Sequence, residues 1–446
     1  MGTAADRLLS LLDAPDRYDT PPSELRAAQV EAANEIFQDR VEHIKLLANR
    51  AEAGAIREIR DLADLVPLLF AHTAYKSYPE NWLAERKWDR LGRWLDTVST
   101  NRVEGVDTKD VGGIDDWIDR LAAKGHYLSC SSGTTGKISM INAAMEDRVL
   151  SKKIVTGTYR WTTGIVAHND YNIFTVNPSG NNFKNSDTTA GMAEAYSAPD
   201  RDHRFRARVT IGEVSRMVAL RRSVVEGTAL PSTIAEYEKI VAERQRLLDE
   251  AVVQVAEGLI ATREQKALII GQFPLVHRVA EAIRARGHGG EQFHPENSLL
   301  VAGGLKGATL PPDYRDYILE TLNIKPRSVY HFYAMQEVNT HFPRCSAGRY
   351  HVAPWVLLLP LDATGERLLQ PQNGQVEGRA GFFDLSIQGR WGGVISGDRI
   401  NVDYGPCACG HHGPTIDSDI VRYKDLPGGD YITCAGTIDA YVRGVA

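Results

Sequence analysis

The sequence has few cysteines, no excess of one charge and no long apolar run. Five cysteines in 446 residues, an odd number, argue against a disulfide framework and favour reduced thiols. Lys and Arg number 51 against 57 Asp and Glu, giving a formal charge of −6, so a basic nucleic-acid-binding surface is not predicted. No apolar run reaches the roughly 18–20 residues that span a bilayer. We therefore expect a cytoplasmic protein that has no membrane span and no nucleic-acid partner.

Composition and length indicate a folded protein with more than one core. Hydrophobic residues make up 43% and charged residues 24% of the chain, and neither a fixed repeat nor a low-complexity stretch occurs. Because a single core usually stops growing at about 250–300 residues, the length predicts at least two core units.

Two long segments carry helical periodicity. In residues 23–50, which follow two prolines, apolar residues recur at the spacing of one helix face. Residues 231–264 have the same three- and four-residue steps, and Thr233 and Glu236 have the spacing of a capping box. We expect a helical N-terminal part and, near 231–264, a helical insertion on the surface of the main core.

Short apolar runs precede glycine turns and new helical segments in the middle of the chain. The runs are Tyr127–Cys130, Ala267–Ile270 and Leu299–Ala302. Strand, turn and helix in alternation predict a parallel sheet with helices on its faces, where ligands bind beyond the carboxyl ends of the strands. From about residue 345, short β-rich runs separated by glycine turns replace this pattern. The fold class is therefore α/β with an added β-rich subdomain.

The strongest chemical motif follows the first of these runs. It consists of Ser131, Ser132, Gly133, Thr134, Thr135, Gly136 and Lys137. Backbone N–H groups and hydroxyls of such a glycine-rich turn can cradle polyphosphate oxygens. It is not a Walker A loop, because Ser131 stands where glycine is needed and Ile138 follows Lys137. A Ser/Thr/Gly cluster alone is usually an ordinary turn.

The string resembles the Ser/Thr-Ser-Gly-Thr-Thr-Gly signature of the ANL adenylate-forming enzymes, which include acyl-CoA synthetases, adenylation domains and luciferases. The resemblance implies an ANL-type large domain in which this loop binds the β- and γ-phosphates of ATP. Thr134 and Lys137 are then candidate catalytic residues. In the family proline and lysine usually follow the second glycine, whereas here Lys137 follows it directly.

Further stretches resemble family motifs and occur in the family's order. The Gly303-Gly304-Leu-Lys306 loop resembles the segment that lies against adenine. Tyr333 to Glu337 resembles the Tyr-Gly-x-Thr-Glu segment, in which the aromatic ring stacks on adenine and the glutamate holds Mg²⁺. The resemblance therefore implies nucleotide binding by the loop and Tyr333, and a catalytic, Mg²⁺-binding role for Glu337.

Two more stretches complete the ordered set. Ser396-Gly397-Asp398 is similar to the Thr-Gly-Asp motif, whose aspartate binds both ribose hydroxyls. Arg422 to Asp425 is similar to the Gly-Arg-x-x-Asp hinge, whose arginine contacts ribose. The resemblance thus implies that Asp398 and Arg422 bind the nucleotide.

Cys407 and Cys409 form a Cys-x-Cys pair followed by glycine and two histidines. Such a pair supplies soft ligands for Zn²⁺, but a tetrahedral site wants four ligands and the spacing is not that of a standard finger. A zinc half-site and an ordinary turn both remain open. A comparable segment in phenylacetate-CoA-ligase-like members favours that branch of the superfamily.

The predicted organisation has four parts. They are an N-terminal helical part (1–120), a nucleotide-binding α/β core (121–344), a β-rich subdomain (345–426) and a short tail (427–446). Family members usually carry a mobile lid domain after the hinge, and the tail stands in its place. Three alternatives would account for the missing lid. The chain was truncated, or a partner protein supplies the lid, or Lys137, Lys306 or Lys424 replaces the lid lysine.

The expected function is ATP- and Mg²⁺-dependent activation of a carboxylic acid. The acyl-adenylate, formed with release of pyrophosphate, would pass its acyl group to coenzyme A, a carrier-protein thiol or an amine. The alternative is a nucleotide-binding subunit without catalytic activity.

Overall fold

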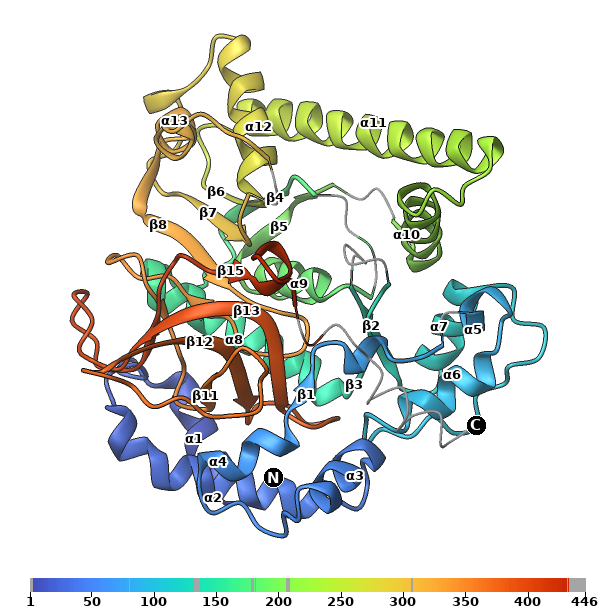
Figure 1. Ribbon diagram of the computed structural model, residues 1–446. Helices are drawn as coiled ribbons and strands as arrows, with labels where there is room; N and C mark the ends of the chain where they lie inside the picture. Colours follow the sequence, from blue (N-terminus) through green and yellow to red (C-terminus); the bar gives the residue numbers. More distant parts are fainter. Residues whose placement is uncertain are drawn as a thin grey trace. The chain divides into compact units, whose positions relative to one another are not determined.

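The chain folds into two compact units (Figure 1). The computed structural model describes residues 3–79, 81–131, 137–177, 180, 182–205, 209–305, 308–430 and 432. Unit 1 comprises Met1–Ser131, Lys137–Ile154 and Met335–Ala446, and unit 2 comprises Ser132–Gly136 and Val155–Ala334. The predicted boundaries at 120, 344 and 426 stay predictions.

Unit 2 is built on a parallel sheet. Its strands are β4 (Tyr171–Thr175), β5 (Ser197–Arg204), β6 (Ala267–Gly271), β7 (Asn297–Ala302) and β8 (Ile324–Tyr333). They lie in the order β5-β4-β6-β7-β8, and each neighbouring pair is parallel. Its helices are α8 (Met145–Thr163, which begins in unit 1), α9 (Lys184–Tyr196), α10 (Ile211–Val225), α11 (Pro231–Ala261), α12 (Phe273–Ala285) and α13 (Tyr314–Thr321). The expected parallel sheet with flanking helices is confirmed.

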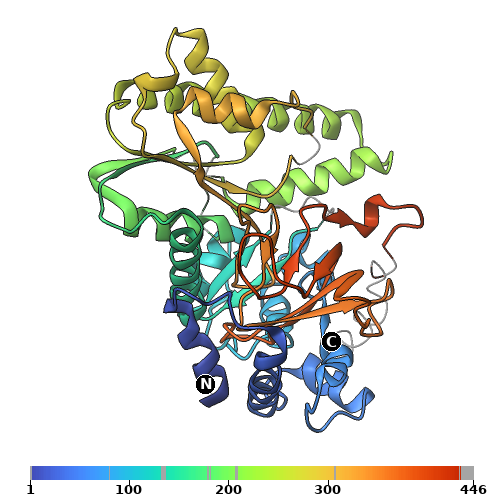
Figure 2. The same ribbon diagram turned by 90° about the vertical axis from the view of Figure 1, so that its left-hand side faces the viewer.

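Each face of this sheet has its own hydrophobic core. Ala267 and Ile269 of β6 pack with residues of α11, α12 and α13, whereas Leu268 and Ile270 pack with residues of α8 and α9. Alternate side chains of a strand point to opposite faces, so both faces of β6 are covered by helices. Figure 2 shows α11 and α12 in yellow-green and yellow; α12 and the last turns of α11 contribute to the core on one face. This burial on both faces explains why β6 and β7 read as continuous apolar runs.

Helix α11 packs on β4 through a glycine. A Cβ added to Gly258 would lie 2.7 Å from the Cε1 atom of Phe174, which is 1% exposed. We expect Gly258→Ala to destabilise the protein, because overpacking of about 1–3 kcal/mol exceeds the gain in helix propensity of about 1 kcal/mol. Chemical denaturation measures the change. Glu257→Ala, at the exposed neighbouring position, is the control, and a Gly258→Ala protein as stable as wild type would contradict the prediction.

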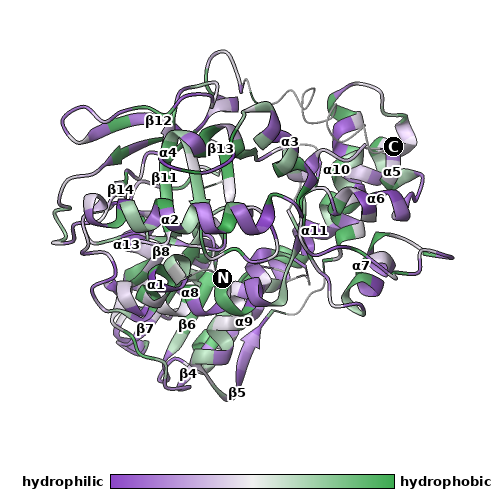
Figure 3. Cartoon of the chain, turned by 90° about the horizontal axis from the view of Figure 1, so that it is seen from below, coloured by the Kyte–Doolittle hydropathy of each residue, from purple (hydrophilic) through white to green (hydrophobic). Residues whose placement is uncertain are grey.

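Unit 1 joins helices and a largely antiparallel sheet. The helices are α1 (Thr3–Ser10), α2 (Pro22–Arg40), α3 (Lys45–Ala53), α4 (Leu62–Leu65), α5 (Asn81–Ala84), α6 (Trp88–Leu95) and α7 (Ile114–Ala122). The strands are β1 (Phe70–Ala71), β2 (Tyr127–Cys130), β3 (Met140–Ala143), β9 (Phe342–Pro343), β10 (Tyr350–His351), β11 (Val356–Leu361), β12 (Gln375–Asp384), β13 (Gly393–Asp403), β14 (Thr415–Ile416) and β15 (Val421–Arg422). In Figure 3 the hydrophobic colour predominates along β11, whereas α2 alternates between hydrophobic and hydrophilic residues.

Strand β13 is the centre of the unit 1 sheet. The strand order is β10-β14-β13-β12-β11, and β1 and β15 also pair with β13. The pairs of β13 with β12, β14 and β15 are antiparallel, whereas its pair with β1 is parallel. The β-rich part expected from about residue 345 is therefore present, and β1 from the N-terminal part of the chain pairs with it.

Three local expectations need correction. Strand β2 does not enter a parallel sheet but forms an antiparallel two-stranded sheet with β3. Residues 23–50 form two helices, α2 and α3, because the chain turns between Arg40 and Ile44. Thr233 lies inside α11, which begins with Pro231 and has no side-chain cap. Capping boxes occur instead at the start of α4, formed by Asp61 with Asp64, and at the start of α10, formed by Thr210 with Glu213.

Among the helices of the described ranges, none combines the length and the apolarity needed to cross a lipid bilayer.

Candidate functional site

Strands β13 and β15 bring together two residues that were predicted to bind the nucleotide. Asp398 and Arg422 are register partners, and the Arg422 Nε atom lies 3.7 Å from the Asp398 Oδ1 atom. The Asp398 side chain is 15% exposed, and its backbone N–H donates to Ser396 Oγ at 2.8 Å. A half-enclosed carboxylate beside a cation, on a rigid central strand, is suited to accept hydrogen bonds from a diol.

His72, which directly follows β1, also lies near Asp398. No sequence motif indicated this residue. Its backbone N–H donates to the carbonyl of Ile395 at 2.9 Å, extending the parallel pairing of β1 with β13. A Cβ on Gly397 would lie 3.2 Å from His72 Cε1 and 3.2 Å from Asp430 Oδ2. Glycine at position 397 therefore lets the imidazole and the second carboxylate approach the strand closely.

His72 and Lys76 share the electrostatic field of Glu337. Burial lowers the pKa of His72 below its usual value, and the negative charges of Glu337, Asp430 and Asp398 partly oppose this shift. Burial also lowers the pKa of Lys76, where Glu337 again opposes the shift and two further cations, Arg422 and Lys424, add to it. The half-buried Glu337 thus acts electrostatically on both His72 and Lys76.

The segment that carries Glu337 is anchored by its backbone. The carbonyl of Glu337 accepts a hydrogen bond from Arg390 Nη2 at 2.9 Å. Asn339 donates from its N–H to Asp384 and from its side chain to Asp147, at 2.9 and 3.0 Å. Because these bonds do not use the Glu337 side chain, its carboxylate remains available to a ligand.

A buried ion pair holds the segment that follows β15 on the same sheet. Arg379 of β12 is fully buried and donates from Nη2 to Asp430 Oδ1 at 2.8 Å. It also donates to the carbonyls of Ala363 and Ser396, and its guanidinium lies 3.9 Å from the ring centre of Tyr423. Tyr423 and Asp430 are thereby held against Arg379, whose strand β12 pairs with the strand β13 that carries Asp398.

The base of the predicted phosphate loop is closed by hydrogen bonds. Ser131 donates its N–H to the Ser139 carbonyl at 3.1 Å, and its Oγ accepts from the Ser139 N–H at 2.8 Å. The Lys137 ammonium donates to the carbonyl of Tyr78 and lies over that ring, 4.1 Å from its centre. Lys137 therefore packs against Tyr78 at the base of the loop. The predicted residues Ser132, Gly133, Thr134, Thr135, Gly136 and Lys306 lie outside the described residues.

In unit 2 the predicted adenine-binding residues meet at one sheet edge. Gly303 and Gly304 directly follow β7, and Tyr333 ends β8; Ala302, the last residue of β7, is the register partner of Phe332, which precedes Tyr333. Gly303 has a φ of 73°, which favours glycine. This is the edge at which open α/β sheets bind ligands. The structure thus groups these three residues in unit 2, and Glu337, Asp398 and Arg422 in unit 1.

Cys407 and Cys409 belong to a larger group in unit 1. Together with Cys345 and His351 they place four potential ligand atoms within 4.8 Å of one another. No sequence pattern indicated Cys345 and His351 as ligands, because they lie far from the Cys-x-Cys pair along the chain and carry no motif of their own.

Comparison with known proteins finds likeness at the level of structure. No protein-family model matches the chain, and no curated protein matches its sequence. An open conformation of 2-hydroxyisobutyryl-CoA ligase, in complex with 2-HIB-AMP and CoA, is 15% identical and has a TM-score of 0.54, with coverage of 92% of this chain and 78% of the ligase chain. The same ligase in the postadenylation state with 2-HIB-AMP is 15% identical, with a TM-score of 0.53 and coverage of 92% and 70%. The same ligase in the thioesterification state, in complex with 2-HIB-AMP and CoA, is 16% identical and has a TM-score of 0.53, with coverage of 92% of this chain and 71% of the ligase chain. The chain therefore has the α/β fold of these ligases, as the resemblance to adenylate-forming enzymes implied.

Proposed function

We propose that this protein activates a carboxylic acid with ATP, releases pyrophosphate and transfers the acyl group from the adenylate to a thiol or an amine. The observation that carries the proposal is the convergence of three separate segments, those of Glu337, Asp398 and Arg422, around the His72 and Lys76 region. Support also comes from the fold, which is that of a CoA ligase captured with an acyl-AMP and CoA. Coenzyme A is accordingly the acceptor to test first.

The residues of unit 1 suit the handling of a nucleotide. Asp398 would accept hydrogen bonds from the ribose hydroxyls, and Arg422 would hold that carboxylate in place. Lys76, together with Arg422 and Lys424, whose charges act on it, would stabilise negative charge on phosphate oxygens as the acid carboxylate attacks the α-phosphorus. Such preorganised charge is commonly the largest catalytic term.

Glu337 is the candidate Mg²⁺ ligand. Mg²⁺ is usually bound through one or two carboxylates together with substrate phosphates and water, and a half-buried carboxylate whose segment is anchored by its backbone fits that role. When bound, Mg²⁺ would neutralise phosphate charge. The protein contributes the position of the carboxylate and the surrounding cations.

The test is ATP–pyrophosphate exchange by the purified chain with a panel of carboxylic acids. Exchange that depends on one class of acid is the expected result, and the best acid then identifies the substrate class. ATP binding without exchange for any acid would favour the nucleotide-binding subunit without catalytic activity. Absence of ATP binding would contradict both functions.

Asp398→Ala should abolish the distinction between ATP and dATP. A hydrogen bond to a charged group contributes about 1.5–3 kcal/mol, so wild type should favour ATP over dATP by roughly 10- to 150-fold in kcat/KM, and the variant should use both about equally. Glu377→Ala, at an exposed position on neighbouring β12, is the matched control and should keep the preference. If wild type has the same kcat/KM for dATP as for ATP, Asp398 does not recognise the ribose hydroxyls.

A further inference from the structure

Three sulfur atoms and one imidazole nitrogen converge in unit 1. The Sγ atoms of Cys345 and Cys407 are 3.8 Å apart, and Cys409 Sγ lies 3.3 Å from His351 Nε2. A disulfide needs a sulfur–sulfur distance of about 2.05 Å. A tetrahedral ion with metal–sulfur bonds of about 2.3 Å places two sulfurs about 3.8 Å apart. The spacing of the two cysteines is therefore that of ligands around one ion.

Two turns of the same construction present the cysteines. In turns 345–349 and 407–411 the first cysteine N–H donates to the carbonyl four residues later, at 2.9 and 2.8 Å. The glycine three residues after the cysteine donates back to the cysteine carbonyl, at 2.9 Å in both turns. These glycines, Gly348 and Gly410, have φ values of 84° and 99°. Two segments distant in sequence thus fold into one turn type around the cluster.

The histidine is supplied by the sheet itself. His351 lies on β10, opposite Thr415 of β14, and Ile416 of β14 is in turn opposite Val402 of β13. The imidazole is thereby fixed at the edge of the sheet whose central strand carries Asp398. All four groups sit on backbone that is already constrained by hydrogen bonds.

The N-terminal segment closes one side of the cluster. The rings of Tyr18 and His411 pack edge-on against His351, with centroids 5.5 and 5.7 Å away. The His411 imidazole is hydrogen-bonded to the carboxylate of Asp19, and the Tyr18 carbonyl accepts from the Gly413 N–H at 2.8 Å. Three of the four candidate ligands are buried and the fourth is half-buried.

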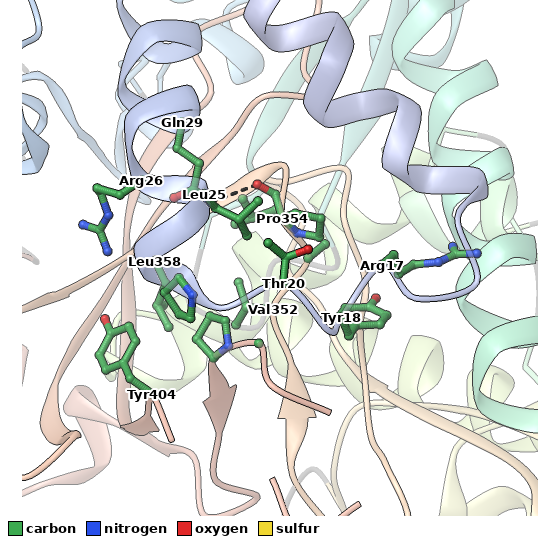
Figure 4. A pocket seen from close by; sticks show the side chains of 15 residues that line it. Arg17, Tyr18, Thr20, Leu25, Arg26, Gln29, Val352, Pro354, Leu358 and Tyr404 are labelled. Carbon is green, nitrogen blue, oxygen red and sulfur yellow. Dashed lines mark hydrogen bonds between the residues drawn. The ribbon is translucent and has the colours of Figure 1, made fainter. Parts of the chain in front are cut away.

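The cavity beside this segment is too small for a substrate. Figure 4 shows Tyr18 and Arg17 on one side of it, and Gln29 of α2, whose side chain donates to the Pro354 carbonyl at 2.9 Å. Its volume is about 20 Å³, room for about one water molecule. The N-terminal segment beside the cluster therefore leaves no room for a substrate in this cavity.

We propose that Cys345, His351, Cys407 and Cys409 bind a structural zinc ion. Three thiolates and an imidazole are a standard tetrahedral donor set for zinc. Soft sulfur ligands disfavour Mg²⁺ and Ca²⁺, and iron–sulfur clusters mostly use four cysteines. Four protein ligands leave no open position for a substrate, so the ion ties the two turns to β10 and supports the sheet that carries Asp398. This site does not depend on the proposed function.

Metal analysis of the purified full chain tests the assignment. We expect one zinc per chain by inductively coupled plasma mass spectrometry, and loss of most of it in Cys345→Ser and in Cys407→Ser. Cys130→Ser is the matched control, since Cys130 is a buried thiol of unit 1 outside the cluster, and it should keep one zinc. Zinc retained in full by both cluster variants would overturn the proposal.

Cobalt substitution tests the same site without any variant. Wild-type chain stripped of metal and titrated with Co²⁺ should develop thiolate-to-cobalt charge-transfer absorption and the visible bands of tetrahedral cobalt, saturating at one equivalent. Adding a chelator should lower the thermal midpoint of the zinc-loaded protein. A chain purified without metal that takes up neither ion, or one whose Cys345 and Cys407 form a disulfide, would show that the cluster is not a metal centre.

Discussion

Replacing Glu337 with glutamine should lower the maximal rate of ATP–pyrophosphate exchange by about 10²- to 10³-fold, the usual effect of removing one preorganised charged or polar group from a reacting centre. Glutamine keeps the size of the side chain but removes the negative charge that acts on Lys76. The carbonyl of residue 337 still accepts from Arg390, so the segment should keep its place. The loss should appear mainly in kcat, because a metal-bound charge acts on the transition state more than on ground-state binding.

Glu366→Gln is the control for this change. Glu366 is exposed in the β-rich part of unit 1, so the same loss of charge there should leave exchange unchanged. Circular dichroism and thermal midpoints of both variants establish that they are folded. If a folded Glu337→Gln protein exchanges pyrophosphate at the wild-type rate, Glu337 does not take part in the chemistry.

Arg379→Met should lower the free energy of unfolding by about 3–5 kcal/mol, the effect of removing one partner from a buried ion pair. Methionine fills much of the volume of arginine, but it leaves the Asp430 carboxylate, whose side chain is 4% exposed, without its guanidinium. The carbonyls of Ala363 and Ser396 also lose a donor. Denaturation in urea, followed by fluorescence, measures the change.

Two further variants separate the buried charge from other effects. Adding Asp430→Asn to Arg379→Met removes the buried negative charge, so the double variant should be more stable than Arg379→Met alone. Arg367→Met breaks a pair of similar length, 2.9 Å to Asp362, but Arg367 is 81% exposed, so its loss should cost less than about 1 kcal/mol. Equal losses for Arg379→Met and Arg367→Met would contradict the prediction.

Much of the secondary structure follows from local pattern. The apolar runs before Gly271 and Gly303 predicted β6 and β7 correctly, because strands covered on both faces need apolar side chains at every position. The periodicity after Pro231 predicted α11, which has one buried face near its end. In contrast, β2 also reads as a strand before a glycine turn, but its partner is β3 and the pairing is antiparallel. The apolar pattern of a strand does not specify which strand it pairs with.

The residues of the candidate site also differ in whether the sequence alone could indicate them. Asp398, Glu337 and Gly303 could be singled out because each lies in a short motif with its own order in the chain. His72 and Lys76 could not, since their place beside Glu337 depends on the pairing of β1 with β13. Their local sequence is that of an ordinary chain segment.

By itself, the sequence determined the α/β class, the main strands and helices, the ordered set of motifs that resemble those of adenylate-forming enzymes, and the Cys-x-Cys pair. These are properties of neighbouring residues, because burial periodicity and turn chemistry act over a few positions of the chain. Only the tertiary structure decided that Cys345 and His351 complete a four-ligand group, and that Arg379 is paired with Asp430. The residues of this group and of this ion pair are brought together by sheet register and by packing between segments that are distant along the chain. No local sequence pattern specifies such contacts.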